Sequence, residues 1–255
     1  MAKNRRKIII FFILLVWALG LLVFLYLNRT YSHIYDTIAM ANLKSVDKER
    51  VYSLGNQDST EKAVYVALGD SLSSGVGTDT YNESYPYLLA TQLSLESKQV
   101  SLIDYSVPGA RTLGLLNGLL PSAISENPDI VTLLIGVNDV HNKISETEFE
   151  KEYAQILQRL AQETKARVYA INIPYIGSKS LILFPHNYVF DIRTKRFNKI
   201  IKKLSEEFKI QYIDLYTPTE SLFKQDGPHY SRDLFHPSAV GYKIWAEIIY
   251  DGINK

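Results

Sequence analysis

The sequence predicts an α/β protein. Its body is expected to be a three-layer α/β/α sandwich around a five-stranded parallel sheet, preceded by one transmembrane helix. Three observations lead to this prediction. Short apolar runs alternate with amphipathic helical patterns after residue 62, and one uninterrupted apolar segment lies near the N-terminus. The 255 residues, of which 46% are hydrophobic, are enough to bury a large core.

The first predicted element is the segment Ile8–Leu27, which contains no charged side chain. A helix of about 20 residues is about 30 Å long, which matches the hydrocarbon core of a bilayer. Basic residues precede the segment, whereas Arg29 alone follows it closely, so the positive-inside rule places the N-terminus in the cytoplasm and the body outside. No small-residue cleavage site follows, which favours an uncleaved signal anchor in the cell membrane over a cleaved signal peptide.

Three parts follow from this pattern. Residues 1–28 are expected to form the cytoplasmic basic start and the anchor, 29–61 a linker that acts as a stalk with a short helix over 34–43, and 62–255 the folded domain. The net charge of +1 combines +5 in residues 1–30 with −4 in the rest, and this acidic body argues against a nucleic-acid partner. The absence of Cys excludes disulfides and a thiol nucleophile.

The five predicted strands are apolar runs rich in β-branched and aromatic residues, as expected for strands buried on both faces of a parallel sheet. They are Ala63–Leu68, Val100–Tyr105, Ile130–Ile135, Arg167–Ile173 and Ile210–Leu215. The clearest helical patterns begin at Phe149, Phe197 and Ser238. In such sheets, functional groups collect at the carboxyl ends of the strands, so the loops that follow these strands are the candidates for chemistry.

Ser71 follows the first strand in the run Gly69-Asp70-Ser71. A Ser directly after a strand and a Gly can sit on a tight turn that points backbone N–H groups at whatever approaches the hydroxyl. The structural alternative is that Ser71 caps a helix that starts there, which is common.

Two further blocks follow the second and third strands. Gly109 could offer an unobstructed N–H, although a Pro-Gly turn is the simpler interpretation of that block alone. Asn138 could aim its side-chain amide into the same crevice, or it could belong to the cap of the next helix.

His236 follows Asp233 by three residues and precedes Pro237. The Pro keeps His236 out of the helical conformation, and Ser238 can then cap the final helix. A carboxylate at this spacing can orient the imidazole ring. An isolated His would be interpreted as a surface residue, but these companions favour a catalytic one.

These four blocks, in this order and at these strand ends, resemble the SGNH hydrolase superfamily, the GDSL-type esterases and lipases. The positions that name the superfamily match Ser71, Gly109, Asn138 and His236, with Asp233 in the acid position. The resemblance implies the flavodoxin-like sandwich of that superfamily for the body, and it does not extend to the anchor or the linker.

The second block departs from the pattern of the superfamily, in which an Asn often precedes the Gly. The nearby positions in this chain are Asp104, Tyr105 and Ser106, which puts the local hydrogen bonding in question but not the Gly. No G-x-S-x-G surrounds Ser71, which argues against the nucleophile elbow of the α/β-hydrolases.

The resemblance implies a serine hydrolase that cleaves carboxylic esters through an acyl-Ser71 intermediate. In that scheme His236 is the general base and then the general acid, and Asp233 orients it. The oxyanion donors are the backbone N–H groups of Ser71 and Gly109 and the side chain of Asn138. The resemblance implies neither a metal ion nor an organic cofactor.

The substrate is less well defined by the sequence. Ile176–Phe190 could be an apolar wall or lid for an acyl chain, or it could cover the edge of the sheet. His141, which closely follows the Asn138 block, could line the site, although a surface position is the favoured interpretation. The leading hypothesis is a membrane-anchored, monomeric lipase or lysophospholipase-like esterase. The second is an enzyme for acylated cell-envelope carbohydrate, and the third is a catalytically silent, membrane-tethered binding domain.

Overall fold

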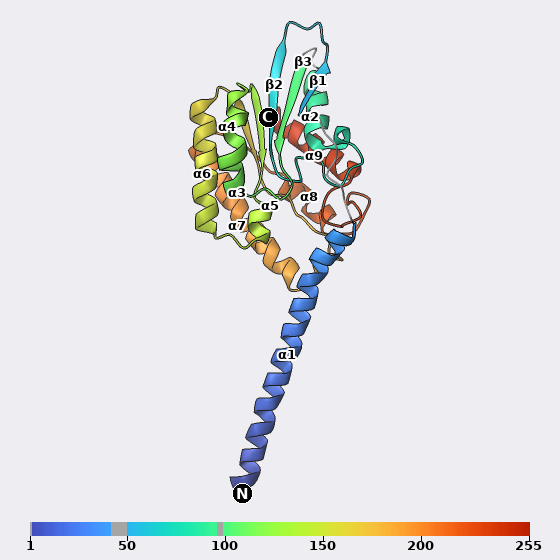
Figure 1. Ribbon diagram of the computed structural model, residues 1–255, viewed down its shortest axis with the longest axis vertical. Helices are drawn as coiled ribbons and strands as arrows, with labels where there is room; N and C mark the ends of the chain where they lie inside the picture. Colours follow the sequence, from blue (N-terminus) through green and yellow to red (C-terminus); the bar gives the residue numbers. More distant parts are fainter. Residues whose placement is uncertain (1, 42–49, 96–98) are drawn as a thin grey trace.

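The computed structural model describes residues 2–41, 50–95 and 99–255, and its body is the predicted α/β sandwich (Figure 1). The central sheet has six strands in the order β1-β3-β2-β4-β5-β6. They are β1 (Val51–Gly55), β2 (Lys62–Gly69), β3 (Gln99–Ser106), β4 (Ile130–Leu134), β5 (Arg167–Ile171) and β6 (Gln211–Ile213).

The sheet contains one strand more than the sequence predicts. Strands β2 to β6 are the five predicted ones, and they pair with one another in parallel. The sixth, β1, pairs with β3 in antiparallel, with Val51 opposite Ile103, and it comes from the predicted linker. Only Leu54 of this strand is buried, so β1 lacks the continuous apolar run by which the other strands were found.

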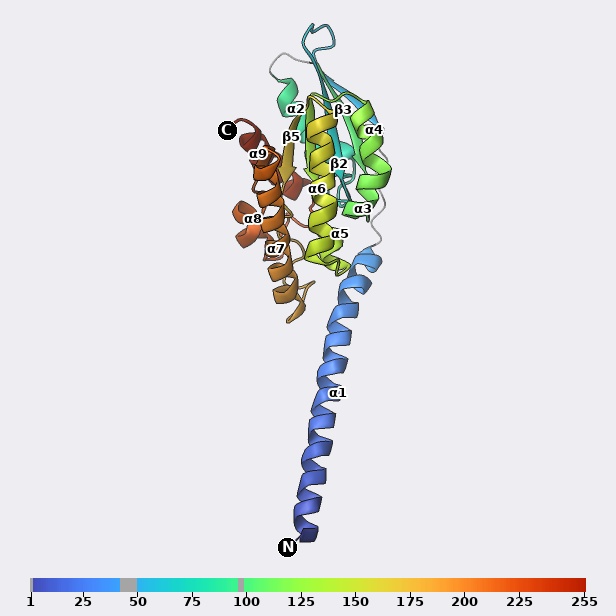
Figure 2. The ribbon, with the colours of Figure 1, turned by 90° about the vertical axis from the view of Figure 1, so that its left-hand side faces the viewer.

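Helices cover both faces of the sheet, as Figures 1 and 2 show. One face carries α2 (Tyr85–Ser94) and α9 (Ala239–Ile253), which pack on each other, and the other carries α6 (Glu146–Glu163) and α7 (His186–Glu207). The shorter elements are η1 (Tyr81–Glu83), α3 (Thr112–Gly114), η2 (Leu115–Leu119), α4 (Leu120–Ser125), α5 (Val137–His141) and α8 (Tyr216–Phe223).

The helices begin where their capping residues predict. The Ser145 side chain accepts a hydrogen bond from the Glu148 N–H at 3.2 Å and starts α6, whose apolar stripe, including Phe149, is buried. The Ser238 side chain accepts from the Gly241 N–H at 3.4 Å and starts α9, which confirms the predicted cap. This cap matters for the site because it fixes the chain directly after His236.

Helix α1 (Ala2–Ala41) extends away from the body as one continuous rod (Figure 1). Among the described residues it is the one helix long and apolar enough to cross a membrane, and a helix of this kind can be an anchor or a signal sequence. The large apolar side chains between Ile8 and Tyr26 are 41–75% exposed, so no part of the body covers them. A bilayer would bury this surface.

The last turns of α1 pack against the body. Thr30 and Ile34 are only 4% and 3% exposed, and the His186 ring donates a hydrogen bond from Nε2 to the Leu27 carbonyl at 3.1 Å. The helix predicted over 34–43 is present as far as Ala41, but it is the last part of α1 rather than a short helix of its own. The remainder of that prediction, and the charged stretch up to residue 49, lie outside the described residues.

Candidate active site

The turn after β2 holds Ser71 in a defined position. Asp70 directly follows the strand, and its side-chain Oδ1 accepts a hydrogen bond from the Leu72 N–H at 2.9 Å. Its carbonyl accepts from the Ser74 N–H at 3.0 Å. These bonds fold the chain back on both sides of Ser71, which lies at the carboxyl edge of the sheet and is 7% exposed. The chain runs through successive turns rather than a helix, so Ser71 is not a helix cap.

The structure brings together Ser71, His236 and Asp233. His236 Nε2 lies 3.0 Å from Ser71 Oγ, although the two residues are 165 positions apart in the chain. The other ring nitrogen, Nδ1, lies 2.5 Å from Asp233 Oδ2. A carboxylate that accepts from Nδ1–H fixes the tautomer in which Nε2 is an acceptor, so the Ser71 hydroxyl donates to His236.

The loop around His236 is held by its own backbone. The Ser231 N–H donates to the His236 carbonyl at 2.9 Å, and the Ser238 N–H donates to the His229 carbonyl at 3.0 Å. Asp233 Oδ1 accepts from the His236 N–H at 2.9 Å, so this carboxylate holds both the ring and the main chain of the same residue. The imidazole is thereby positioned before any ligand arrives.

Asp233 is fully buried, and two influences act on its pKa in opposite directions. Burial alone would raise the pKa, but the hydrogen bonds from His236, Ser231 and the Phe235 N–H hold it below the ordinary value. Asp233 is therefore ionised at neutral pH and can stabilise a positive charge on the imidazole.

Gly77 allows the nucleophile turn to approach the histidine loop closely. Its φ is +105°, and a Cβ at this position would lie 2.3 Å from the Pro237 carbonyl oxygen and 3.0 Å from the His236 Cβ. Any larger residue would push the two segments apart, which would lengthen the contact between Ser71 and His236.

Gly109 and Asn138 lie at the same end of the sheet. Gly109 has φ +80°, and no atom lies within 4 Å of the place where its Cβ would be, so its backbone borders open space. The Asn138 amide nitrogen donates to the Ala110 carbonyl at 3.0 Å and approaches Asp70 Oδ2 at 3.5 Å. Gly109 and Asn138 both line the pocket that contains Ser71.

One pocket of about 340 Å³ connects these groups. Its size is in the range of small-molecule sites in proteins. The residues that line it are Ile34, Tyr35, Ile38, Ser71, Val76, Pro108, Gly109, Asn138, His141, Asn142, Phe235 and His236.

His141 corrects the sequence-based expectation of a surface position. It lines the pocket, and its ring packs between Phe190 and Phe235 at centroid distances of 4.5 and 5.2 Å. Burial, with a smaller contribution from the Arg193 charge, lowers the pKa of His141 to about 4, so the ring is neutral at pH 7. His141 follows Asn138 by three residues in the sequence, and this proximity was the feature that could have indicated a position at the site.

Asp70 was given no role from the sequence, although it directly precedes Ser71. Burial raises the pKa of Asp70 to about 7, in spite of the hydrogen bond from the Leu72 N–H. The carboxyl group is therefore partly neutral near pH 7, which reduces the negative charge next to Asn138.

The wall expected from Ile176–Phe190 lies elsewhere. No residue of this segment lines the pocket around Ser71, and the part from His186 onward is the beginning of α7. The apolar lining comes instead from Ile34 and Ile38 of α1 and from Val76, Pro108 and Phe235 of the body. The first part of the predicted linker therefore packs on the site.

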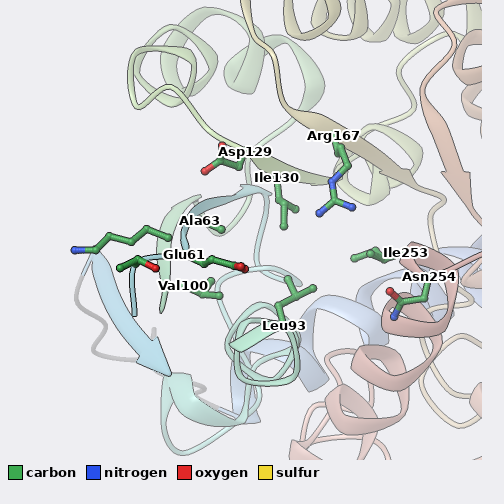
Figure 3. Close-up of a pocket in the computed structure, with 11 residues that line it drawn as sticks. Glu61, Ala63, Leu93, Val100, Asp129, Ile130, Arg167, Ile253 and Asn254 are labelled. Atoms are coloured by element: carbon green, nitrogen blue, oxygen red, sulfur yellow. The ribbon is translucent and has the colours of Figure 1, made fainter. Parts of the chain in front are cut away.

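A second pocket, of about 470 Å³, lies at the opposite end of the sheet (Figure 3). It is lined by the amino ends of β2, β4 and β5 and by the end of α9, with Glu61, Asp129 and Arg167 among its polar groups. None of its described lining residues is a Ser or a His, so it offers no nucleophile paired with a base. Within the described part of the chain, no cluster of three or more His, Asp and Glu side chains could hold a metal ion.

Comparisons with known proteins agree with this geometry. The model of the GDSL-like lipase/acylhydrolase family matches residues 67–244. The chain is 26% identical over 207 residues to the spore germination lipase LipC of Bacillus licheniformis, covering 72% of this chain and 92% of LipC.

Solved structures share the fold. A lipase/acylhydrolase from Enterococcus faecalis superposes with a TM-score of 0.63 at 24% identity, over 75% of this chain and 95% of that one. The acetylxylan esterase Axe2 from Geobacillus stearothermophilus gives a TM-score of 0.59 at 17% identity, over 76% of this chain and 94% of Axe2.

Proposed function

Because this chain belongs to the GDSL-like lipase/acylhydrolase family, we propose that it is a serine hydrolase that cleaves carboxylic esters through an acyl-Ser71 intermediate. The observation that carries the proposal is the continuous hydrogen-bonded chain from Ser71 Oγ through the His236 ring to Asp233 at the edge of a pocket. A hydroxyl that donates to an oriented imidazole is an activated nucleophile.

The first half of the proposed reaction forms the acyl-enzyme. Ser71 Oγ attacks the ester carbonyl carbon while its proton passes to His236 Nε2, and Asp233 stabilises the resulting imidazolium. The carbonyl oxygen becomes an oxyanion. The C–O bond to the alcohol then breaks, and His236 returns its proton to the leaving alcohol, so the alcohol departs neutral.

The second half releases the acid. A water molecule gives a proton to His236 Nε2 and attacks the acyl-Ser71 carbonyl. The second tetrahedral intermediate collapses, the bond to Ser71 Oγ breaks, and His236 returns the proton to the serine. The net reaction is ester plus water to acid plus alcohol, with the enzyme unchanged.

The oxyanion is proposed to bind the backbone N–H groups of Ser71 and Gly109 and the side-chain amide of Asn138. The open space beside Gly109 supports this role, since its backbone can approach a ligand without obstruction. The contact of the Asn138 amide with Asp70 is long, at 3.5 Å, so one amide hydrogen is available for a better acceptor.

We also propose that α1 is an uncleaved, single-pass anchor with its N-terminus in the cytoplasm and the catalytic domain outside. The exposed apolar surface between Ile8 and Tyr26 supports the membrane placement, and the basic residues ahead of it support the orientation. The proposed division is an anchor in residues 1–28, a connector after it and a catalytic domain from residue 62, to which β1 adds an edge strand.

The leading substrate class is a lipid ester, cleaved by a lipase or lysophospholipase type of activity. The likeness to LipC supports this class, and the apolar side of the pocket is consistent with it. The second candidate, an acylated cell-envelope glycan, is supported only by the fold shared with Axe2. Hydrolysis of acetyl esters but not of longer ones would select the second candidate.

The direct test uses the full chain in detergent micelles with a fluorophosphonate probe and p-nitrophenyl butyrate. Labelling at Ser71, and loss of both labelling and hydrolysis in Ser71→Ala, are expected. Ser122→Ala, which removes an exposed hydroxyl on α4, is the matched control and should keep both. Equal hydrolysis by the wild type and Ser71→Ala would contradict the proposal. An unlabelled, inactive wild type would favour the silent binding domain.

A further inference from the structure

The pocket around Ser71 is not built by the catalytic domain alone. Ile34, Tyr35 and Ile38 of α1 line the same pocket as Ser71 and His236. At about 3.6 residues per turn, positions 34, 38 and 35 lie within about 100° of one another around the helix axis, so these three side chains form a single strip on the side of α1 that lines the pocket. The helix that carries the anchor therefore contributes one wall of the candidate active site.

Specific contacts hold this part of α1 against the body. The Tyr26 hydroxyl donates to the Phe184 carbonyl at 2.8 Å, and the His33 Nε2 donates to the Ser180 carbonyl at 3.2 Å. Ile34 is 3% exposed and belongs to the main hydrophobic core of the body. Contacts spread over two turns of helix fix both the position and the rotation of the strip.

The two sides of the pocket differ in chemistry. Polar atoms of Ser71, Asn138 and His236 stand on one side, where an ester group would react. Aliphatic side chains of Ile34 and Ile38 stand on the α1 side. An acetyl group would end next to Ser71, whereas a longer hydrocarbon chain would bury its methylenes against α1. Each fully buried CH₂ contributes about 0.8 kcal/mol of favourable transfer free energy.

The distance along α1 connects this wall to the membrane surface. Ile34 follows Leu27, the end of the apolar segment, by seven residues, or about 10 Å of helix. The polar layer of a bilayer extends about 5–8 Å beyond the hydrocarbon core on each side. Phe184, whose side chain is 68% exposed, lies at the start of this stretch, where its carbonyl accepts from the Tyr26 hydroxyl. The pocket wall thus begins close to where lipid headgroups end.

We propose that the strip of α1 formed by Ile34, Tyr35 and Ile38 is the acyl-binding wall of the enzyme, and that its substrate is an amphiphilic lipid ester with a long hydrocarbon chain. The chain lies between α1 and the body, with the ester carbonyl at Ser71. Tyr35 and Ile38 act as specificity-determining residues for chain length. This inference rests on the proposed ester hydrolysis at Ser71.

The test exploits the absence of Cys from the sequence, because one introduced thiol is then the only one in the protein. Full-length Tyr35→Cys is reconstituted in phosphatidylcholine vesicles and reacted with a p-nitrophenyl phosphonate that carries either a methyl or a dodecyl chain. The reaction of the introduced thiol with a maleimide is then timed. Met40→Cys is the matched control, because Met40 is 81% exposed and does not line the pocket.

The dodecyl phosphonate should slow maleimide labelling several-fold in Tyr35→Cys, the methyl phosphonate should not, and neither should affect Met40→Cys. Equal labelling of Tyr35→Cys after both phosphonates, with Ser71 modified in each case, would overturn this inference and leave the proposed function standing. Failure of both phosphonates to modify Ser71 in the wild type would overturn the two together.

A kinetic measurement completes the test. Ile38→Ala should lower kcat/KM for a dodecanoyl ester by about tenfold, because the wall loses three carbons, while acetyl ester hydrolysis stays unchanged. Met40→Ala should change neither. An equal fall for both esters in Ile38→Ala would show a general disturbance of the fold and would overturn the assignment of Ile38 to chain-length specificity.

Discussion

The two ends of the parallel sheet carry pockets of similar size but of different chemistry. The pocket at the amino ends of the strands is the larger, at about 470 Å³ against about 340 Å³, and it is bordered by Asp129 and Arg167. The smaller pocket, at the carboxyl ends, holds the hydrogen-bonded chain of Ser71, His236 and Asp233. The two pockets are therefore distinguished by their side chains and not by their volume.

The difference comes from the direction of the strands. Strands β2 and β4 are parallel and end at the same edge of the sheet, so the segments that follow them lie close together. The loop before α9 packs at this edge too, where His236 contacts Ser71. At the opposite edge Asp129 is used to hold backbone, since its Oδ2 accepts from the Val64 N–H at 2.8 Å. The carboxyl end of the sheet therefore brings reactive side chains together, whereas the carboxylate of Asp129 at the amino end binds backbone.

The strongest test of this contrast exchanges a carboxylate for an amide at each end. Asp233→Asn should lower kcat for p-nitrophenyl butyrate by about 10⁴-fold, because the amide no longer fixes the His236 tautomer or stabilises the imidazolium. Asp129→Asn, at the far end, should leave kcat within error. A comparable loss in both variants would remove the functional distinction between the ends.

Removal of an amide at each end gives the next largest effect. Asn138→Ala should lower kcat by about 10²–10³-fold through the loss of one oxyanion donor. Asn254→Ala, in the pocket of Figure 3, should not lower it. Circular dichroism confirms that both variants fold. An Asn138→Ala enzyme of full activity would exclude this residue from the oxyanion site.

The pH dependence of stability sharpens the comparison at the reactive end. The lowered pKa of His141 means that the unfolded chain takes up a proton between pH 6.5 and about 4 while the folded chain does not, so stability falls as pH falls through that window. The loss attributable to His141 should be about 3 kcal/mol. Asp70, whose pKa is raised from 3.8 to about 7, acts in the opposite direction over the whole of that range, so the wild type alone does not show the His141 contribution.

His141→Phe isolates this contribution. Thermal unfolding of the wild type and the variant is measured from pH 7 to pH 4, with Asp70 and Asp233 unchanged in both. The difference in stability between them should shift in favour of the variant as the pH falls. A constant difference across the range would show that His141 titrates alike in the folded and unfolded states.

The smallest effect is expected at the far end. Asp129→Ala removes the acceptor of the Val64 N–H and should lower the unfolding free energy by about 1 kcal/mol. Thermal unfolding followed by the fluorescence of the buried Trp245 reports the change. Activity at a temperature well below the midpoint should be unaffected, and a large loss of kcat would mean that this end takes part in the reaction.

Much of the fold was accessible from the sequence because the parallel strands are buried on both faces. Such strands appear as continuous apolar runs, and all five were predicted at nearly their observed positions. Strand β1 was missed because it lacks this double-sided burial: it lies at the edge of the sheet and has one buried side chain, Leu54. An exposed edge strand has no distinctive apolar pattern.

The candidate site was predicted in part. The order of the blocks at successive strand ends indicated that Ser71 and His236 would meet, and they lie within hydrogen-bond distance. The contribution of α1 was not accessible, because a polar helix next to an anchor carries no signal of what it packs against. Only the packing of α1 against the body shows that Ile34 and Ile38 line the pocket.

Ser71 and His236, which are hydrogen-bonded to each other, come from opposite ends of the sequence of the folded domain. Ser71 follows the first parallel strand, while His236 stands directly before the last helix, α9, which packs on α2. During synthesis the nucleophile leaves the ribosome long before its base. In the proposed mechanism Ser71 therefore has no base until the segment before α9 has folded against the body, so the onset of ester hydrolysis is coupled to the completion of folding.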